Sequence, residues 1–243
     1  MKMKKNTITK IECVWEHNGS DTLLYASNFP GAYARGENLT VAIEKMPAEI
    51  RSYLTWADCA IPEVLTVEVV QDAACSLNIS DADSDVLFLS EKDPLTMDEY
   101  AQLKQLVLKS AADFHSLYES IPDKNRSSTP ERKTFYGQVP RTAEEMYLHT
   151  KSVNEYYFAE IGINADNNGT ILTCRQRGFD ALEVTSDFLT SPVMEGSYGE
   201  YWSLRKVLRR FLWHDRIHAR AMYRMAVQEF GAESVPDIFR FTK

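Results

Sequence analysis

A change of hydrophobic period near Pro94 sets the main limit on how this chain of 243 residues can fold. Before Pro94, apolar residues tend to alternate with polar ones, as they do in β-strands. After it, they recur every three to four residues, as they do on one side of an α-helix. We therefore predict an α+β protein in two parts, with a small α+β domain over residues 1–92 and an all-helical domain over residues 93–243.

The first domain is expected to contain short strands around one helix. Turn-forming residues separate runs that are rich in β-branched and aromatic side chains. These runs predict strands at residues 8–16, 22–27, 32–35 and 64–70. The helix is predicted over residues 39–54, with Pro47 expected to shorten or kink it. Residues 86–89 are a further candidate strand. The order of elements is therefore β-β-β-α-β.

The turn that leads into this helix has a recognisable pattern. Pro30-Gly31 is followed by a second glycine, Gly36, and then by a helix with Ala42 on its apolar side. The pattern resembles the HicB-like antitoxin fold and covers about the first ninety residues. HicB antitoxins commonly carry a DNA-binding segment after this domain, and none is visible here. The resemblance therefore implies a packing or interaction domain that recognises a protein partner.

Four long amphipathic helices are predicted after Pro94. Their expected ranges are 97–121, 142–161, 172–189 and 200–229. Thr142 with Glu145 forms a capping-box sequence at the start of the second helix, and Gly231 follows the fourth as a typical helix-ending residue. Residues 123–140 are expected to be a long loop. Four helices with one apolar side each favour a four-helix bundle.

Three histidines fall on the apolar sides of these helices. His149 lies in the second helix, and His214 and His218 lie four residues apart in the fourth. Because residues at i and i+4 share one helix face, both rings of this pair are able to approach one metal ion. A buried imidazole without a partner costs a few kcal/mol, so each ring is either hydrogen-bonded in the core or bound to a metal. His17 and His115 lie off these apolar sides.

The histidine segments also resemble a known family. Residues 144–149 end in a single histidine, and residues 213–218 contain the H-x-x-x-H spacing. Together they resemble the DinB-like, or YfiT-like, metal-binding proteins over residues 95–243. The resemblance implies an up-down-down-up bundle, frequently dimeric, that binds zinc or nickel through His149, His214 and His218. Characterised relatives transfer low-molecular-weight thiols such as bacillithiol or mycothiol, or act in thiol-dependent isomerisation.

Such a site suggests two kinds of chemistry. Three imidazoles leave a coordination position open, so a bound thiol becomes a thiolate nucleophile or a bound water becomes hydroxide. The candidate activities are therefore thiol S-transfer and hydrolysis of a small molecule. Asp215 and Glu145 flank ligands in the sequence and are expected to orient them rather than to act as catalysts. Because neutral imidazole is the ligand, metal binding is expected to weaken below about pH 6.

Composition narrows the class of protein. The formal net charge of −8 argues against nucleic acid or an anionic membrane as a general partner. No run of about 18 apolar residues occurs, and the basic start at residues 1–5 leads into polar sequence, so neither a transmembrane helix nor a signal peptide is expected. The scattered cysteines fit reduced, mostly buried thiols in a cytoplasmic protein. They are Cys13, Cys59, Cys75 and Cys174.

Two functions from different classes follow. The first is a metal-dependent enzyme acting on a small molecule, in a homodimer. The second is a non-catalytic interaction protein in which the HicB-like domain binds a protein partner.

The fourth helix is also rich in cations, for which we expect a solvated face paired with acidic neighbours rather than an anion site. These cations are Arg205, Lys206, Arg209, Arg210, Arg216, Arg220 and Arg224.

Overall fold

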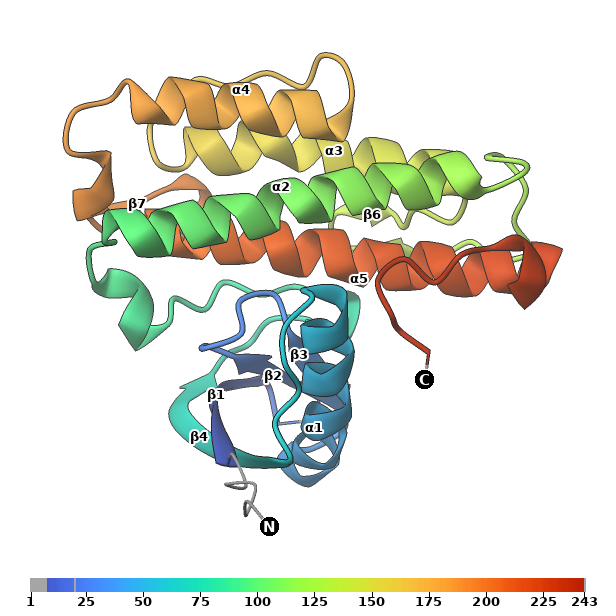
Figure 1. Cartoon of the computed structure of the whole chain (residues 1–243), viewed down its shortest axis with the longest axis horizontal. Coiled ribbons are helices and arrows are strands. Elements are labelled where there is room, and N and C mark those ends of the chain that lie inside the picture. The colour runs from blue at the N-terminus through green and yellow to red at the C-terminus, as the bar shows by residue number, and fades with distance from the viewer. Residues whose placement is uncertain (1–7, 20, 243) are drawn as a thin grey trace, which may run out of the picture. The chain divides into compact units, whose positions relative to one another are not determined.

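A computed structural model describes residues 8–19 and 21–242, and its architecture is mixed α+β, as predicted (Figure 1). The described residues form a sheet near the N-terminus and five α-helices. The chain divides into two compact units, one formed by residues up to Ser90 together with those from Arg240 on, and the other by residues 91–239. The basic start at residues 1–5 lies outside the described residues.

The first unit is a four-stranded sheet with one helix packed on it. Its elements are β1 (Ile8–His17), β2 (Thr22–Ala26), β3 (Tyr33–Gly36), α1 (Leu39–Trp56) and β4 (Val64–Ala74). The strand order is β3-β2-β1-β4, with antiparallel pairing throughout except for the parallel pair β1–β4. Short turns join the antiparallel strands, and α1 supplies the crossover that a parallel pair requires.

One expectation for this unit was wrong in part and another was wrong. Pro47 does not shorten α1, which continues to Trp56, and Met46 and Ile50 on either side of the proline are fully buried. Residues 86–89 do not form a strand. Side chains take the place of a strand partner there: the backbone N–H of Val86 donates to Glu16 Oε1 at 3.3 Å, and that of Leu89 donates to Gln71 Oε1 at 2.7 Å.

The second unit contains the four predicted long helices. They are α2 (Met97–Ser120), α3 (Ala143–Ala159), α4 (Ile171–Glu183) and α5 (Leu204–Phe230). The capping box of Thr142 and Glu145 is present, and Gly231 ends α5 with a φ of +83°. The third helix stops six residues earlier than predicted, at Glu183 rather than 189. The following Thr185, Ser186 and Asp187 are poor helix formers, and Asp187 is left-handed.

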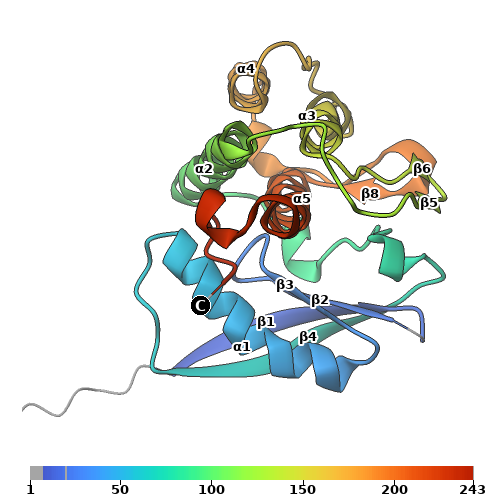
Figure 2. The same ribbon diagram turned by 90° about the vertical axis from the view of Figure 1, so that its right-hand side faces the viewer.

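Contacts between helix ends define the helix directions (Figures 1 and 2). Tyr100, near the start of α2, donates its hydroxyl to Glu183 at the end of α4. The hydroxyl of Tyr147, early in α3, accepts from the backbone N–H of Ile171 at the start of α4. Arg205, at the start of α5, pairs with Glu99 at the start of α2. Helices α2 and α5 therefore run in one direction, and α3 and α4 run in the other.

Two small hairpins interrupt the connections between these helices. The predicted loop at 123–140 contains β5 (Lys133–Thr134) and β6 (Gly137–Gln138), and the connection before α5 contains β7 (Met194–Glu195) and β8 (Tyr201–Trp202). The 3-10 turns lie at Ile79–Asp81, Leu89–Lys92, Phe188–Thr190, Ser197–Gly199 and Ala232–Ser234. No helix within the described ranges is long and apolar enough to span a membrane.

The close approach of α3 and α4 depends on Gly178. A Cβ atom at this position would lie 2.1 Å from Cε2 of Phe158, a ring that is fully buried. Alanine normally stabilises a helix relative to glycine by about 1 kcal/mol. At this position the overlap with a ring that has no room to move outweighs that gain.

We predict that Gly178→Ala lowers the free energy of unfolding by about 1–3 kcal/mol, because overpacking of this size is expected to force the helices apart. Urea unfolding followed by circular dichroism would measure the change. Phe158→Leu provides the matched test. The double variant Gly178→Ala/Phe158→Leu should lose less stability than the two single variants lose in sum. Strict additivity, or a more stable Gly178→Ala variant, would contradict this account of the helix contact.

Candidate metal centre

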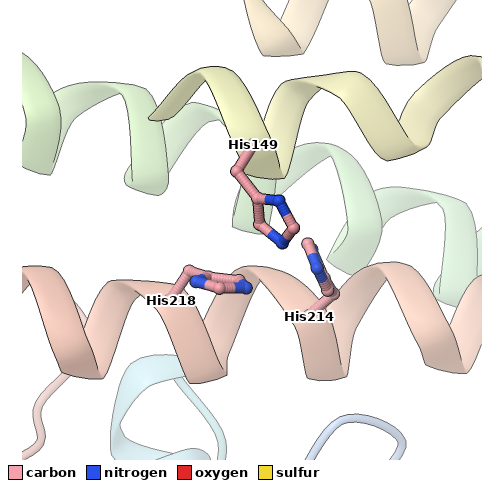
Figure 3. A group of neighbouring side chains, drawn as sticks. All are labelled: His149, His214 and His218. Atoms are coloured by element: carbon pink, nitrogen blue, oxygen red, sulfur yellow. The ribbon is translucent and has the colours of Figure 1, made fainter. Parts of the chain in front are cut away.

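The structure brings together the three histidines that the sequence singled out. His149 extends from α3, His214 and His218 extend from α5, and the three rings point toward one another (Figure 3). The ring centroids are 5.1 Å apart for His149 and His214, 4.7 Å for His149 and His218, and 4.4 Å for His214 and His218. One nitrogen of each ring lies within 4.8 Å of the others.

This spacing is close to what a metal ion requires. Zinc–nitrogen bonds of about 2.0–2.1 Å place neighbouring ligand nitrogens about 3.3 Å apart in a tetrahedral site. The rings are already carried on helices that face one another, so the remaining difference is small enough for side-chain rotation to address. The triad is the one group of three or more His, Cys, Asp or Glu residues in the described part of the chain that could hold a metal ion.

Local sequence explains how the rings reach this position. The Thr142 capping box begins α3 and places His149 two turns later on the side that faces α5. In α5, the four-residue spacing puts His214 and His218 on one face, next to the buried Phe211 and Met222. The predicted arrangement of one histidine on one helix and two on another is therefore present in three dimensions.

Burial keeps these imidazoles uncharged. His214 is buried, and His149 and His218 are partly exposed. Burial lowers the pKa of His149, and it lowers the pKa of His218 to about 3. Burial and the two neighbouring imidazoles also hold the pKa of His214 well below its usual value. The rings are therefore in the neutral form that binds metals, and protons displace a metal at a lower pH than an ordinary histidine would allow.

One nitrogen of the triad is buried without a hydrogen-bond partner. Within the described residues, Nδ1 of His214 is shielded from solvent and no donor or acceptor lies within bonding distance. An unsatisfied buried polar atom typically costs about 1–3 kcal/mol, so its presence requires an explanation. A satisfied core histidine, the alternative reading of the sequence, would not leave this atom without a partner. The donor set and the unpaired nitrogen both fit a metal ligand.

Aromatic and cationic side chains surround the triad. The ring of Tyr157 meets His214 edge-on at 6.1 Å, and the ring of Tyr136 lies nearly parallel to His149 at 6.4 Å. The guanidinium of Arg210, one turn before His214, lies 4.9 Å from the Trp213 ring. Tyr157 was recognisable from its place on the apolar side of α3. Tyr136 was not, because it belongs to a hairpin with no hydrophobic period.

The acidic residues next to the ligands do not orient them, contrary to expectation. Asp215 is fully buried and pairs with Arg175 of α4 at 3.3 Å. Glu145 accepts backbone N–H groups from Arg141 and Thr142 in the capping box. Neighbours along a helix point in different directions, and each carboxylate finds its partner on the side away from the triad.

The cations of α5 also differ from expectation. Lys206, Arg209 and Arg216 are buried rather than solvated. Acidic side chains neutralise two of them, since Lys206 pairs with Glu200 at 2.9 Å and Arg209 pairs with Glu91. The sequence did not predict this burial, because these cations interrupt the apolar pattern of α5. In the structure they lie on the buried side of the helix, where ion pairs make their burial possible.

The other two histidines have neighbours of their own. His17 stacks on Trp15 and contacts Asp72 at 2.9 Å, and His115 packs beside Tyr118 and Tyr147. The cysteines are free thiols, as expected. Cys13 and Cys174 are buried, whereas Cys75 is partly exposed and Cys59 is exposed.

No protein-family model, curated protein or solved structure matches the chain. The likeness to HicB-like and DinB-like proteins therefore rests on the residues that carry it. A function has to be argued from the geometry and chemistry of the triad.

We predict that the metal-free protein loses stability as the pH falls from about 6.5 toward 3. The unfolded chain binds protons to these histidines through this range, whereas the folded chain does not, so protonation favours unfolding. Each histidine adds up to about 1.4 kcal/mol per pH unit to the slope. Urea unfolding in the presence of a chelator would measure it, and His218→Gln should flatten the slope. Equal slopes for both proteins would show that His218 titrates normally in the folded state.

Proposed function

We propose that this chain binds a divalent metal ion through His149, His214 and His218 and uses it in chemistry on a small molecule. The observation that carries the proposal is the convergence of three imidazoles from two helices, with one nitrogen of each within 4.8 Å of the others. Imidazole ligands suit zinc and nickel among common cellular metals. The unpaired Nδ1 of His214 supports ligation over a purely structural role.

The DinB-like resemblance supports the same proposal. The pairwise contacts place α2 and α5 in one direction and α3 and α4 in the other, which is the up-down-down-up order that the resemblance implies. The single histidine lies on the second of these helices and the pair on the fourth. The resemblance also favours a homodimer, and it is the basis for choosing a thiol as the first substrate class to test.

The ligand set favours an anionic partner for the ion. Three neutral imidazoles leave the charge of a divalent ion uncompensated, so a thiolate or hydroxide in the open position is stabilised. When bound, such an ion supplies Lewis acidity and lowers the pKa of a coordinated thiol or water. The partly exposed rings of His149 and His218 give a small molecule access to this position.

The surroundings favour thiol transfer over hydrolysis. General-base hydrolysis calls for a carboxylate or another base near the water, and Asp215 and Glu145 are both engaged elsewhere, with Arg175 and with the helix cap. Thiol transfer would require less of the protein, because a free thiol already has a much lower pKa than water and coordination would ionise it more completely at neutral pH. We therefore infer a metal-dependent thiol S-transferase as the first candidate and a hydrolase as the second.

An interaction protein remains the alternative function. The first unit has its own sheet, and β4 is an edge strand of 11 residues with Val64 and Val70 exposed. A long edge strand offers backbone groups for pairing with another chain. This feature favours the HicB-like unit as the part that would recognise a protein partner.

We predict that the protein takes up about one zinc or nickel ion per chain, and that His149→Ala and His214→Ala each abolish stoichiometric binding, because two imidazoles rarely hold a divalent ion. Metal content after loading and gel filtration, measured by mass spectrometry, would show this. His115→Ala is the matched control, since it removes a helical histidine outside the triad. Wild-type protein that stays metal-free after loading with either ion would exclude the proposed site.

We predict that the metal-loaded protein consumes low-molecular-weight thiols in the presence of a small electrophile, and that His218→Gln lowers this rate by about tenfold or more. The reason is that thiolate formation at the ion depends on all three ligands. Loss of free thiol, followed over time against the metal-free protein, measures the activity. A rate that does not depend on the metal would leave the metal as a structural group and favour the interaction protein.

A further inference from the structure

The hairpin after α2 carries two neighbouring aromatic side chains that the fold leaves in solvent. Phe135 is 62% exposed and Tyr136 is 46% exposed, and their rings meet edge to face with centroids 4.9 Å apart. Aromatic side chains contribute most to stability when they are buried, so the exposed part of this pair is available for contacts outside the fold. Such pairs commonly mark a surface that contacts a ligand or partner.

This pair lies next to the proposed metal centre. The ring of Tyr136 is nearly parallel to that of His149, with an interplanar angle of 25° and centroids 6.4 Å apart. An ion bound to His149 would lie about 3 Å from the centre of its ring. The ring of Tyr136 is therefore within about 10 Å of the ion. A small ligand with a metal-binding group at one end and one ring at the other is able to bridge that distance.

Contacts on both sides hold the hairpin in this place. Before it, Arg126 and the backbone N–H of Ser128 both bond to Glu229 near the end of α5, at 3.1 and 2.5 Å. After it, Arg141 pairs with Glu131 at 3.3 Å, just before α3 begins. Figure 2 shows β5 and β6 on the side of the bundle where α3 and α5 lie. The aromatic pair is thus presented beside the triad by an anchored loop.

We propose that Tyr136 and Phe135 form the contact surface for an aromatic or other flat apolar group of the molecule that binds at the metal centre. The ion would hold the coordinating atom, Tyr136 would stack on the flat group, and Phe135 would meet its edge. This inference rests on the proposed metal function and adds to it a substrate class. It makes Tyr136 and Phe135 determinants of specificity, separate from the three ligands.

Two hydroxamates test this role, because they share one metal-binding group and differ only in the group attached to it. Benzohydroxamate carries a phenyl ring, and acetohydroxamate carries a methyl group. Calorimetric titration of the zinc-loaded full chain would give both dissociation constants. We expect benzohydroxamate to bind more tightly to the wild type. We expect Tyr136→Ala, and the double variant Phe135→Ala/Tyr136→Ala, to reduce that preference by about five- to tenfold, since aromatic contacts contribute this much.

Control variants separate this inference from the metal function. Tyr136→Phe keeps the ring and should keep the preference. Tyr198→Ala removes a tyrosine that is 98% exposed in the connection before α5, and it should leave the preference unchanged. Normal zinc uptake with an unaltered preference in the double variant overturns this inference alone. Equal weakening by Tyr198→Ala also overturns it, and a wild-type chain that takes up no zinc overturns both proposals.

Discussion

The burial of uncharged imidazoles between α3 and α5 is the constraint on which the site depends. A charged histidine in this position would lose solvation that the surrounding aromatic rings do not replace, so the fold selects the neutral form. His214 is buried beside Tyr157, and its Nδ1 is without a protein partner in the described structure. The same burial that keeps the rings neutral, and so able to bind a metal, also leaves a buried nitrogen unsatisfied in the metal-free site.

Ion pairs within the bundle engage charged side chains that are close in sequence to the three histidines. Asp215 lies next to His214 in the sequence, yet its carboxylate is held by Arg175 on α4. Arg175 in turn packs against the ring of Phe211, 3.8 Å from its centroid. Buried pairs of this kind contribute little net stability, but removing one partner is strongly destabilising. They therefore act mainly to fix which side of α5 faces α3, and they keep the carboxylate of Asp215 out of the candidate ligand set.

Periodicity made the bundle and the triad predictable, because both follow from local spacing. The positions of His149, His214 and His218 could be assigned to the inner sides of their helices without knowing how the helices pack. The capping box at Thr142 was equally local. The partners of Asp215 and Arg209 come from distant parts of the chain and leave no trace in a single sequence. Tyr136 belongs to a hairpin whose flanking residues contact Glu131 and Glu229, and these contacts have no local sequence signal, so its place beside His149 could not be predicted.

Because the three candidate ligands are divided between two helices, metal binding would follow an order in time during folding. His214 and His218 come together as soon as one turn of α5 forms, which is a fast local event. His149 joins only after α3 has docked, because 64 residues separate it from the next ligand. An ion present during folding would therefore meet a two-ligand site first and would favour early formation of α5. Formation of the third bond, between the ion and His149, would then show that α3 has docked. The metal would in this way serve as a probe of the order in which the helices of the bundle assemble.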